Sequence, residues 1–224
     1  MAEDDMKARV LDAALAHVPF DGWSDRTLRA ALADTGLAAG LGRSLFPRGG
    51  VDLALAYHAR GDAEMVARLK GMDLSALRFR DRIAQAVRVR LELADRELVR
   101  RGTTLFSLPL HAADGARAIW NTADAIWMAL GDTAEDLNWY TKRATLSAVY
   151  GATVLFWLGD DSTDRQATWD FLGRRIDQVM QIEKLKASFR ENPLGKAFLA
   201  GPGKILESIR APRLRKDLPG WHER

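Results

Sequence analysis

The sequence predicts an all-helical protein, and three observations support this. Apolar residues recur with helical spacing, most clearly at Ile83, Val87 and Leu91, where steps of four residues place side chains on one helix face. No segment shows the polar–apolar alternation of a half-buried strand. Glycine, proline and capping residues separate the periodic segments where helices would end. We therefore expect a bundle of helices without a sheet.

Composition limits the classes of chemistry that the chain can support. With 47% hydrophobic and 28% charged residues, the 224-residue chain has the balance of a soluble globular protein. It contains no cysteine, which excludes disulfides and thiolate chemistry. The N-terminal Met-Ala-Glu-Asp-Asp is acidic and lacks an apolar stretch, so we expect neither a secretory signal nor a transit peptide.

The basic charge is concentrated at the C-terminus. Residues 184–224 hold ten Lys or Arg and four Asp or Glu, a net charge of +6, whereas residues 1–183 carry −3. On charge alone, such a tail suits anionic lipid and nucleic acid equally well.

Residues 1–70 have the arrangement of a TetR-type helix-turn-helix unit. The expected order is a helix over 6–17 ended by Pro19 and Gly22, a second from Ser24, a short third, and a linker helix over 51–70. A DNA-reading third helix needs polar side chains and nearby bases. Residues 37–46 offer two glycines, two alanines and one base, Arg43. We expect a degenerate unit that binds no nucleic acid.

Residues 71–190 should form a helical body. An arginine-rich helix is expected over 79–101, a helix containing 119–130 follows the 108–111 connection, and two further helices follow. Capping-box spacings place the starts of those two at Thr133, with Asp136, and at Thr163, with Gln166. The uncharged run 144–159 would span about 24 Å as a helix, short of the roughly 30 Å hydrocarbon core, so we expect it to be buried in the protein.

The sequence contains no convergent set of catalytic or metal-binding residues. The four histidines, at 17, 58, 111 and 222, are scattered without metal-ligand spacing on one helix face. The acidic run 160–164 lacks the glycine and distal glutamate of a calcium loop, and no phosphate-binding loop is present. We therefore expect no catalysis, no metal and no cofactor.

The body mixes large aromatic residues with small ones around 120–127 and 150–157. Small residues facing large ones leave an apolar cavity between helices, or simply pack together, and composition does not separate these cases. The candidate lipid-binding residues are Trp120, Ile126, Trp127, Tyr150, Val154 and Trp157.

A second candidate site is the stripe Asp136, Trp139, Tyr140 and Arg143. Their spacing of i, i+3, i+4 and i+7 places them along one helix face. Two large aromatics between an acid and a base suit a contact surface, although a buried core helix is the alternative. For Arg143, a helix-stabilising pair with Asp136 or side-chain contacts with Asn138 is an equal explanation.

The tail beyond residue 190 contains two short amphipathic, basic segments broken by proline and glycine. Such segments suit a membrane interface, and they equally suit docking on the body or on a second copy of the chain. The candidate membrane-contact residues are Leu194, Phe198, Leu199, Ile205 and Ile209.

Residues 136–150 strongly resemble the signature of the ubiquinone (coenzyme Q) biosynthesis accessory lipid-binding family, found in mitochondria and alphaproteobacteria. The likeness continues at 18–24, 108–111 and 168–176, and covers most of residues 6–182. The tail after Glu183 departs from the mitochondrial members. The absence of a targeting sequence suggests an alphaproteobacterial member, located in the cytoplasm against the inner membrane.

The resemblance implies a TetR-like fold without DNA binding and a non-catalytic role. Family members bind isoprenoid lipids, including ubiquinone intermediates, and contact membranes through a C-terminal segment. They present the intermediate to a di-iron demethoxyubiquinone hydroxylase, and their partner-facing patch matches Asp136, Trp139 and Tyr140 here. A homodimer is plausible in this fold. The alternative function is that of a ligand-responsive TetR-type repressor, and a stand-alone enzyme is a weaker third.

Overall fold

The computed structural model describes residues 3–191 and 210–211, with side chains through 181 and at 210–211. Within these ranges the chain forms α-helices, one short 3-10 helix, η1, and no strand. The predicted all-α, TetR-like fold is thus confirmed in its helical content. In chain order, the elements are α1 (Glu3–Asp21), α2 (Asp25–Thr35), α3 (Ala39–Leu45), α4 (Gly50–Lys70), α5 (Phe79–Glu92), α6 (Arg96–Phe106), α7 (Ala112–Ala129), α8 (Leu137–Gly159), η1 (Thr163–Arg165) and α9 (Gln166–Glu191).

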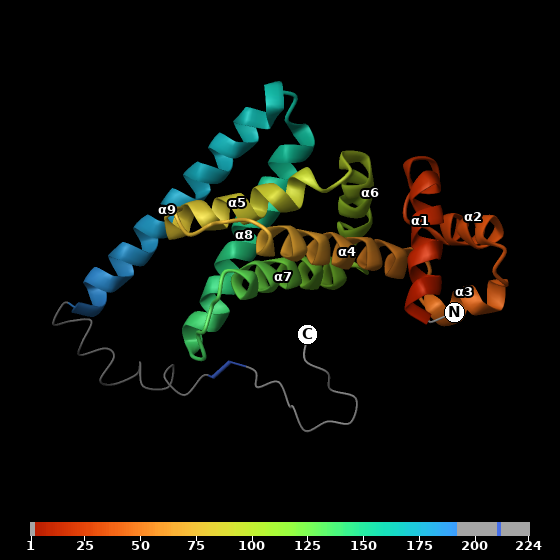
Figure 1. The fold of residues 1–224 in the computed structure, drawn as a ribbon, viewed down its shortest axis with the longest axis horizontal. Helices are drawn as coiled ribbons and strands as arrows, with labels where there is room; N and C mark the ends of the chain where they lie inside the picture. The colour runs from red at the N-terminus through yellow and green to blue at the C-terminus, as the bar shows by residue number, and fades with distance from the viewer. Residues whose placement is uncertain (1–2, 192–209, 212–224) are drawn as a thin grey trace.

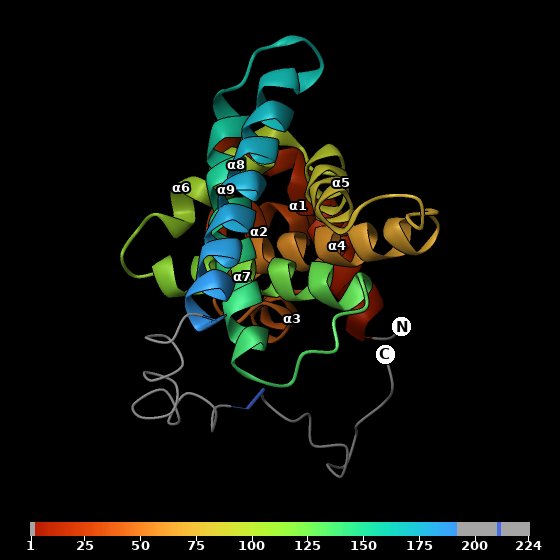
Figure 2. The ribbon, with the colours of Figure 1, turned by 90° about the vertical axis from the view of Figure 1, so that its left-hand side faces the viewer.

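The helices enclose two hydrophobic cores that α4 connects. As Figure 1 shows, α4 runs from the small N-terminal unit of α1–α3 into the body formed by α5–α9. Leu53 and Ala54, near the start of α4, belong to the N-terminal core. Met65 and Leu69, near its end, belong to the body core. In the perpendicular view of Figure 2, α8 and α9 lie beside one another across the body.

Polar contacts tie the N-terminal unit to the body. The indole Nε1 of the buried Trp23 donates to the Leu98 carbonyl in α6 at 3.1 Å. Arg48, in the turn before α4, forms an ion pair of 2.9 Å with Asp114 in α7. Leu98 also contributes its side chain to the N-terminal core, so that core extends beyond residue 70.

The predicted helix 79–101 is wrong as a single element. The chain breaks after α5 and restarts at α6, where the Asp95 carboxylate accepts hydrogen bonds from the backbone N–H groups of Glu97 and Leu98. The apolar spacing continues through the break, which is why periodicity alone joined the two helices. An aspartate N-cap stabilises the new start by satisfying otherwise unpaired N–H groups.

Three predicted helix ends also differ from the structure. Pro19 lies inside the last turn of α1, which ends before Gly22. Asp136, and not Thr133, caps α8 by accepting from the Asn138 N–H. Ahead of α9, Ser162 Oγ accepts from Ala167 N, whereas Thr163 lies within η1. The acidic run there acts as a cap, because Asp160 accepts from Thr168 N and Oγ1.

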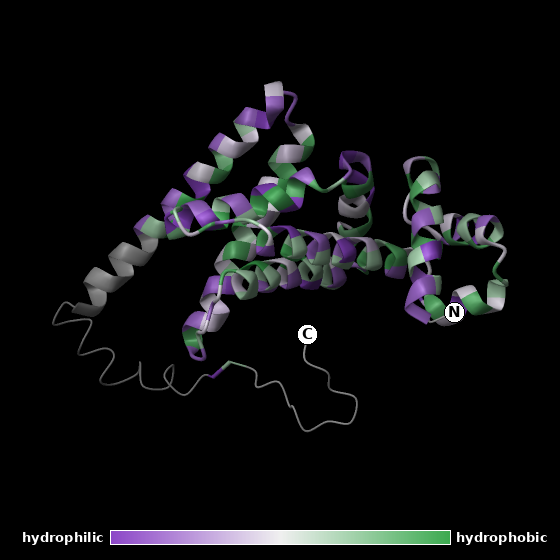
Figure 3. Cartoon of the chain, viewed as in Figure 1, coloured by the Kyte–Doolittle hydropathy of each residue, from purple (hydrophilic) through white to green (hydrophobic). Residues whose placement is uncertain are grey.

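Hydrophilic and hydrophobic residues are interspersed along the helices, as the hydropathy colouring of Figure 3 shows. This pattern is that of helices with one face against a core. Among the described residues, none of the helices is both long and apolar enough to cross a membrane.

Candidate lipid cavity and aromatic patch

An apolar cavity of about 390 Å³ lies in the body between α4, α6, α7 and α8. Small residues line it, among them Gly102, Gly151 and several alanines, whereas Gly115 allows the close approach of Phe106. Its size falls toward the lower end of the roughly 300–1,000 Å³ of ligand pockets in proteins. Leu155, a lining residue that is 62% exposed, marks an opening toward the surface.

The predicted lipid-binding residues divide into two groups. Tyr150 and Val154 line the apolar cavity, while the other four do not. Ile126, Trp127 and Trp157 are buried in the body core, so their assignment to a cavity is corrected. The Trp127 indole is held there by donating to the Lys142 carbonyl at 3.1 Å. Trp120 is half-buried and contacts Trp139, on another side of the helix pair.

One end of the apolar cavity is polar, a feature that the sequence analysis missed. His58 and Arg90 line this end together with Tyr150. Arg90 is buried and donates from Nε to Asp62 at 2.8 Å and from Nη2 to the His58 carbonyl at 3.1 Å. Burial opposes the charged form of Arg90, but the tyrosine and Asp62 interactions leave its pKa raised. One sequence signal existed: Arg90 is three residues after Val87 and four before Ala94, on the apolar face of its helix.

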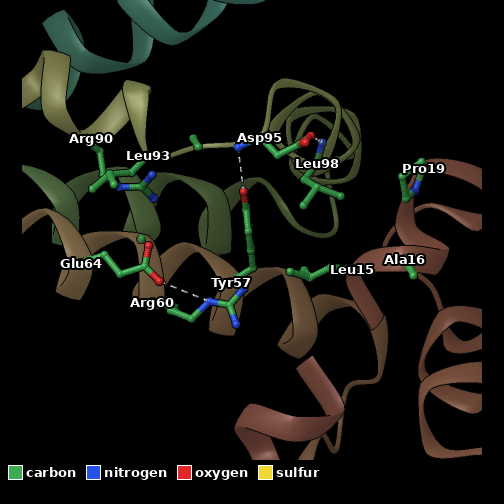
Figure 4. Close-up of a pocket in the computed structure, with 12 residues that line it drawn as sticks. Leu15, Ala16, Pro19, Tyr57, Arg60, Glu64, Arg90, Leu93, Asp95 and Leu98 are labelled. Carbon is green, nitrogen blue, oxygen red and sulfur yellow. Dashed lines mark hydrogen bonds and ion pairs between the residues drawn. The ribbon is translucent and has the colours of Figure 1, made fainter. Parts of the chain in front are cut away.

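A second cavity, of about 460 Å³, lies between α1, α4 and the α5–α6 connection (Figure 4). Its lining carries more charge than the apolar cavity, including Arg60 paired with Glu64. The Tyr57 hydroxyl accepts from the Asp95 N–H at 3.1 Å, as Figure 4 shows. The two cavities share four lining residues: Tyr57, Arg90, Ala94 and Leu98.

The side chains of Asp136, Trp139 and Tyr140 lie at the N-terminal end of α8, and we call these three residues the aromatic patch. Asp136 is exposed and both aromatics are half-buried. The rings of Trp139 and Tyr140 meet edge to face with centroids 4.8 Å apart. Trp120 from α7 lies against Trp139 at 6.0 Å. A partly exposed cluster of this kind presents apolar area together with polar edges.

Arg143 is not part of this surface, contrary to the expectation that it lies on an exposed stripe. Its side chain is fully buried and pairs with Asp124 at 2.5 Å and Asp132 at 3.0 Å. The expected alternative pair with Asp136 does not form, because Arg143 instead reaches α7 and the loop that follows it.

The buried ion pair also supports the patch from below. The guanidinium of Arg143 lies 4.0 Å from the Trp139 ring centroid, within the range of a cation–π contact. Burial alone would raise the pKa of Asp132, but hydrogen bonds from Lys142 and Arg143 outweigh it and lower that pKa. Asp132 is therefore a carboxylate at neutral pH, and Arg143 acts as a structural support for Trp139.

The described part of the tail contacts the aromatic patch. The Tyr140 hydroxyl donates to the Arg210 carbonyl at 3.2 Å. The Ala211 N–H donates to the Glu135 carbonyl at 2.9 Å. Residues 210–211 therefore dock on the body of the protein. The five predicted membrane-contact residues, Leu194, Phe198, Leu199, Ile205 and Ile209, lie outside the described residues.

Within the described chain, no group of three or more histidine or acidic side chains is placed to hold a metal ion. His17 pairs with Asp34, and His58 belongs to the polar end of the apolar cavity.

Comparison with known proteins identifies the segment that carries both sites. Residues 112–183 match the family model of COQ9. This segment is therefore similar to the COQ9 family. The matched segment contains the aromatic patch and one wall of the apolar cavity, including Tyr150 and Val154.

Curated COQ9 proteins extend the likeness over most of the chain. The mitochondrial ubiquinone biosynthesis protein COQ9 of Drosophila melanogaster is 30% identical over 188 residues, which cover 81% of this chain and 57% of the relative. The human protein of the same name is 28% identical over 190 residues, 81% of this chain and 59% of the relative. The chain thus spans less than two thirds of the length of these relatives. The similarity supports a role in ubiquinone biosynthesis.

A solved structure supports the fold. The TetR transcriptional regulator from Nitrosomonas europaea superposes with a TM-score of 0.60 and 19% identity, covering 78% of this chain and 97% of that one. The predicted TetR-like architecture is therefore confirmed.

Proposed function

We propose that this chain is a non-catalytic, lipid-binding accessory protein of ubiquinone biosynthesis. In this role it holds an isoprenoid quinone intermediate in the apolar cavity and presents it to the di-iron demethoxyubiquinone hydroxylase. The observation that carries the proposal is that the COQ9 segment 112–183 contributes both a wall of the cavity and the whole aromatic patch. Burying an isoprenoid chain offsets its loss from a bilayer at about 0.8 kcal/mol per CH₂, which makes transfer nearly neutral in free energy.

The cavity opening suggests how a lipid would enter. Leu155 lies at the opening, and the α6–α7 connection beside it exposes Leu108 at 51% and Leu110 at 84%. Exposed leucines next to an apolar opening suit contact with a membrane surface. The basic charge of residues 184–224 would add electrostatic attraction to anionic lipid. In a homodimer, the second copy of the chain would contribute the same charge again.

The aromatic patch is the proposed hydroxylase-binding surface. Tryptophan and tyrosine are the residues that most often carry interface energy. We expect Trp139→Ala and Tyr140→Ala each to weaken binding of the purified hydroxylase roughly tenfold or more, measured by surface plasmon resonance. Ala148→Ser, at an exposed position of α8 outside the patch, is the matched control. Unchanged binding in both variants, with the fold intact, would refute this surface.

The alternative function, a ligand-responsive repressor, finds less support in α3. The residues that α3 exposes are small or neutral except for Arg43. Gly42 packs against α2, where an added Cβ would lie 2.2 Å from a Leu32 methyl carbon. The glycine therefore serves helix packing, and one base gives little phosphate binding. A sequence-specific gel shift with DNA from the neighbouring genomic region would reverse this preference.

A further inference from the structure

The polar end of the apolar cavity contains an ordered chain of hydrogen bonds that fixes the protonation of His58. His58 Nε2 lies 2.7 Å from Thr122 Oγ1 and 3.1 Å from the Ala118 carbonyl. Because a carbonyl oxygen only accepts, Nε2 must carry the hydrogen. Thr122 then donates to Asp62 at 2.8 Å, and Asp62 also accepts from Arg90. His58 and Thr122 thus each donate to an acceptor.

His58 is neutral at physiological pH, which leaves its other ring nitrogen as an acceptor. The largest influence on the pKa of His58 is burial, which lowers it. The charge on Asp62 raises this pKa, whereas the charge on Arg90 lowers it further. A neutral imidazole with hydrogen on Nε2 carries a lone pair on Nδ1. Asp62 and Arg90 balance one another, so the end of the cavity has no net charge. A neutral ligand suits it better than an anion.

The Nδ1 atom of His58 is accessible and unsatisfied. Among the described residues it has no hydrogen-bond partner, and it is not one of the fully buried unpaired polar atoms, which are Arg80 Nε, Ser147 Oγ and Arg175 Nε. The His58 side chain is 21% exposed, and His58 lines the apolar cavity. The protein therefore presents an unpaired hydrogen-bond acceptor at the polar end of the cavity.

Two aromatic side chains also line this cavity. The rings of Trp23 and Tyr57 have their centroids 5.3 Å apart. The Tyr57 oxygen accepts from Asp95 N–H, so its own hydrogen remains available to donate. Flat aromatic walls favour a flat ring, and an unpaired acceptor favours a ring with a hydroxyl group.

We propose that this end of the cavity is a head-group site for a neutral hydroxylated aromatic ring, and that it selects the reduced, hydroquinone form of the ligand over the oxidised quinone. The selectivity rests on the proposed lipid-binding function. A hydroquinone donates its O–H to His58 Nδ1, whereas a quinone has only acceptors and leaves that nitrogen unpaired. One hydrogen bond of this kind amounts to a preference of about three- to tenfold.

The test measures this preference directly. Titration calorimetry under argon compares the hydroquinone and quinone forms of a dimethoxy-methyl ring with a ten-carbon chain, each binding to the full chain. We expect the hydroquinone to bind about three- to tenfold more tightly to the wild type. His58→Gln keeps a polar group near the Nε2 position and removes the acceptor at Nδ1, so the ratio should fall to about one. His58→Asn, which places its carbonyl oxygen near Nδ1, should keep the preference.

The ratio of two affinities is measured within each variant, so a partly unfolded sample does not change it. A wild-type ratio near one, or an unchanged ratio in His58→Gln, would overturn the head-group site and leave lipid binding intact. Failure of the proposed function gives a different result, in which neither form binds, even with a full isoprenoid chain attached to the ring.

Discussion

At its N-terminal end α8 presents two aromatic side chains above a buried arginine, whereas toward its C-terminal end the same helix borders a cavity. Trp139 and Tyr150 are eleven residues apart, or roughly 16 Å along the helix. A buried ion pair fills the space under the patch, while Gly151 and Val154 leave space open beside the cavity. If the proposed function holds, lipid binding and partner contact would use separate residues of one helix. Mutations should therefore separate the two properties.

The largest expected effect comes from removing the support of the patch. Arg143→Met leaves Asp132, whose side chain is 2% exposed, without its buried partner. Loss of one member of a buried ion pair typically costs about 3–5 kcal/mol of folding free energy. Urea unfolding followed by circular dichroism measures this. Lys142→Met, which removes the more exposed partner of Asp132, is the control and should cost much less. Equal losses of folding free energy in the two variants would contradict the expectation that the buried partner contributes more.

Filling the cavity should come next in size. Val154→Trp places a large side chain in the lining of the apolar cavity. We expect retained isoprenoid lipid to fall at least tenfold, with a stability cost of about 1–3 kcal/mol from overpacking. Ala148→Trp, an exposed position on the same helix, should retain lipid. If Val154→Trp also abolished hydroxylase binding, the two ends of α8 would not be separable.

How much the sequence could predict differs between these two ends. The helical content follows from residue spacing, which is local, although the cap of α8 is Asp136 and not the predicted Thr133. The burial of Arg143 does not, because its partners Asp124 and Asp132 lie in a different helix and the following loop. Likewise Trp127 and Trp157 lie in segments whose composition suits a cavity wall, yet their side chains pack into the core. Packing between helices decides such cases, and periodicity reports only which face is apolar.

The tail contact allows a smaller test of the patch end. Ala211→Pro removes the N–H that donates to the Glu135 carbonyl. If residues 210–211 occupy part of the partner surface, weakening their attachment should strengthen hydroxylase binding by about two- to fourfold, an effect of less than one hydrogen bond. Surface plasmon resonance with the full chain is the measurement. Weaker binding would mean that this segment contributes to the interface.

The smallest expected effect is the pH dependence of the cavity end. The pKa of His58 is lowered in the folded state, chiefly by burial. As pH falls below the ordinary histidine value of about 6.5, the unfolded chain takes up the proton first, so folding stability decreases. His58→Gln should lose less stability than the wild type on acidification from about pH 7.5 to 5.5. If the urea midpoints of the wild type and of His58→Gln fell by the same amount on acidification, His58 would not be held neutral.

The most direct test of the central claim, that the body holds an isoprenoid quinone intermediate, is native mass spectrometry of the full chain purified from its own cells. We expect a bound species whose fragments contain a hydroxylated aromatic ring and an isoprenoid chain, and whose signal is lost in Val154→Trp. A protein that carries no lipid, or one whose lipid signal is the same in Val154→Trp, would contradict it.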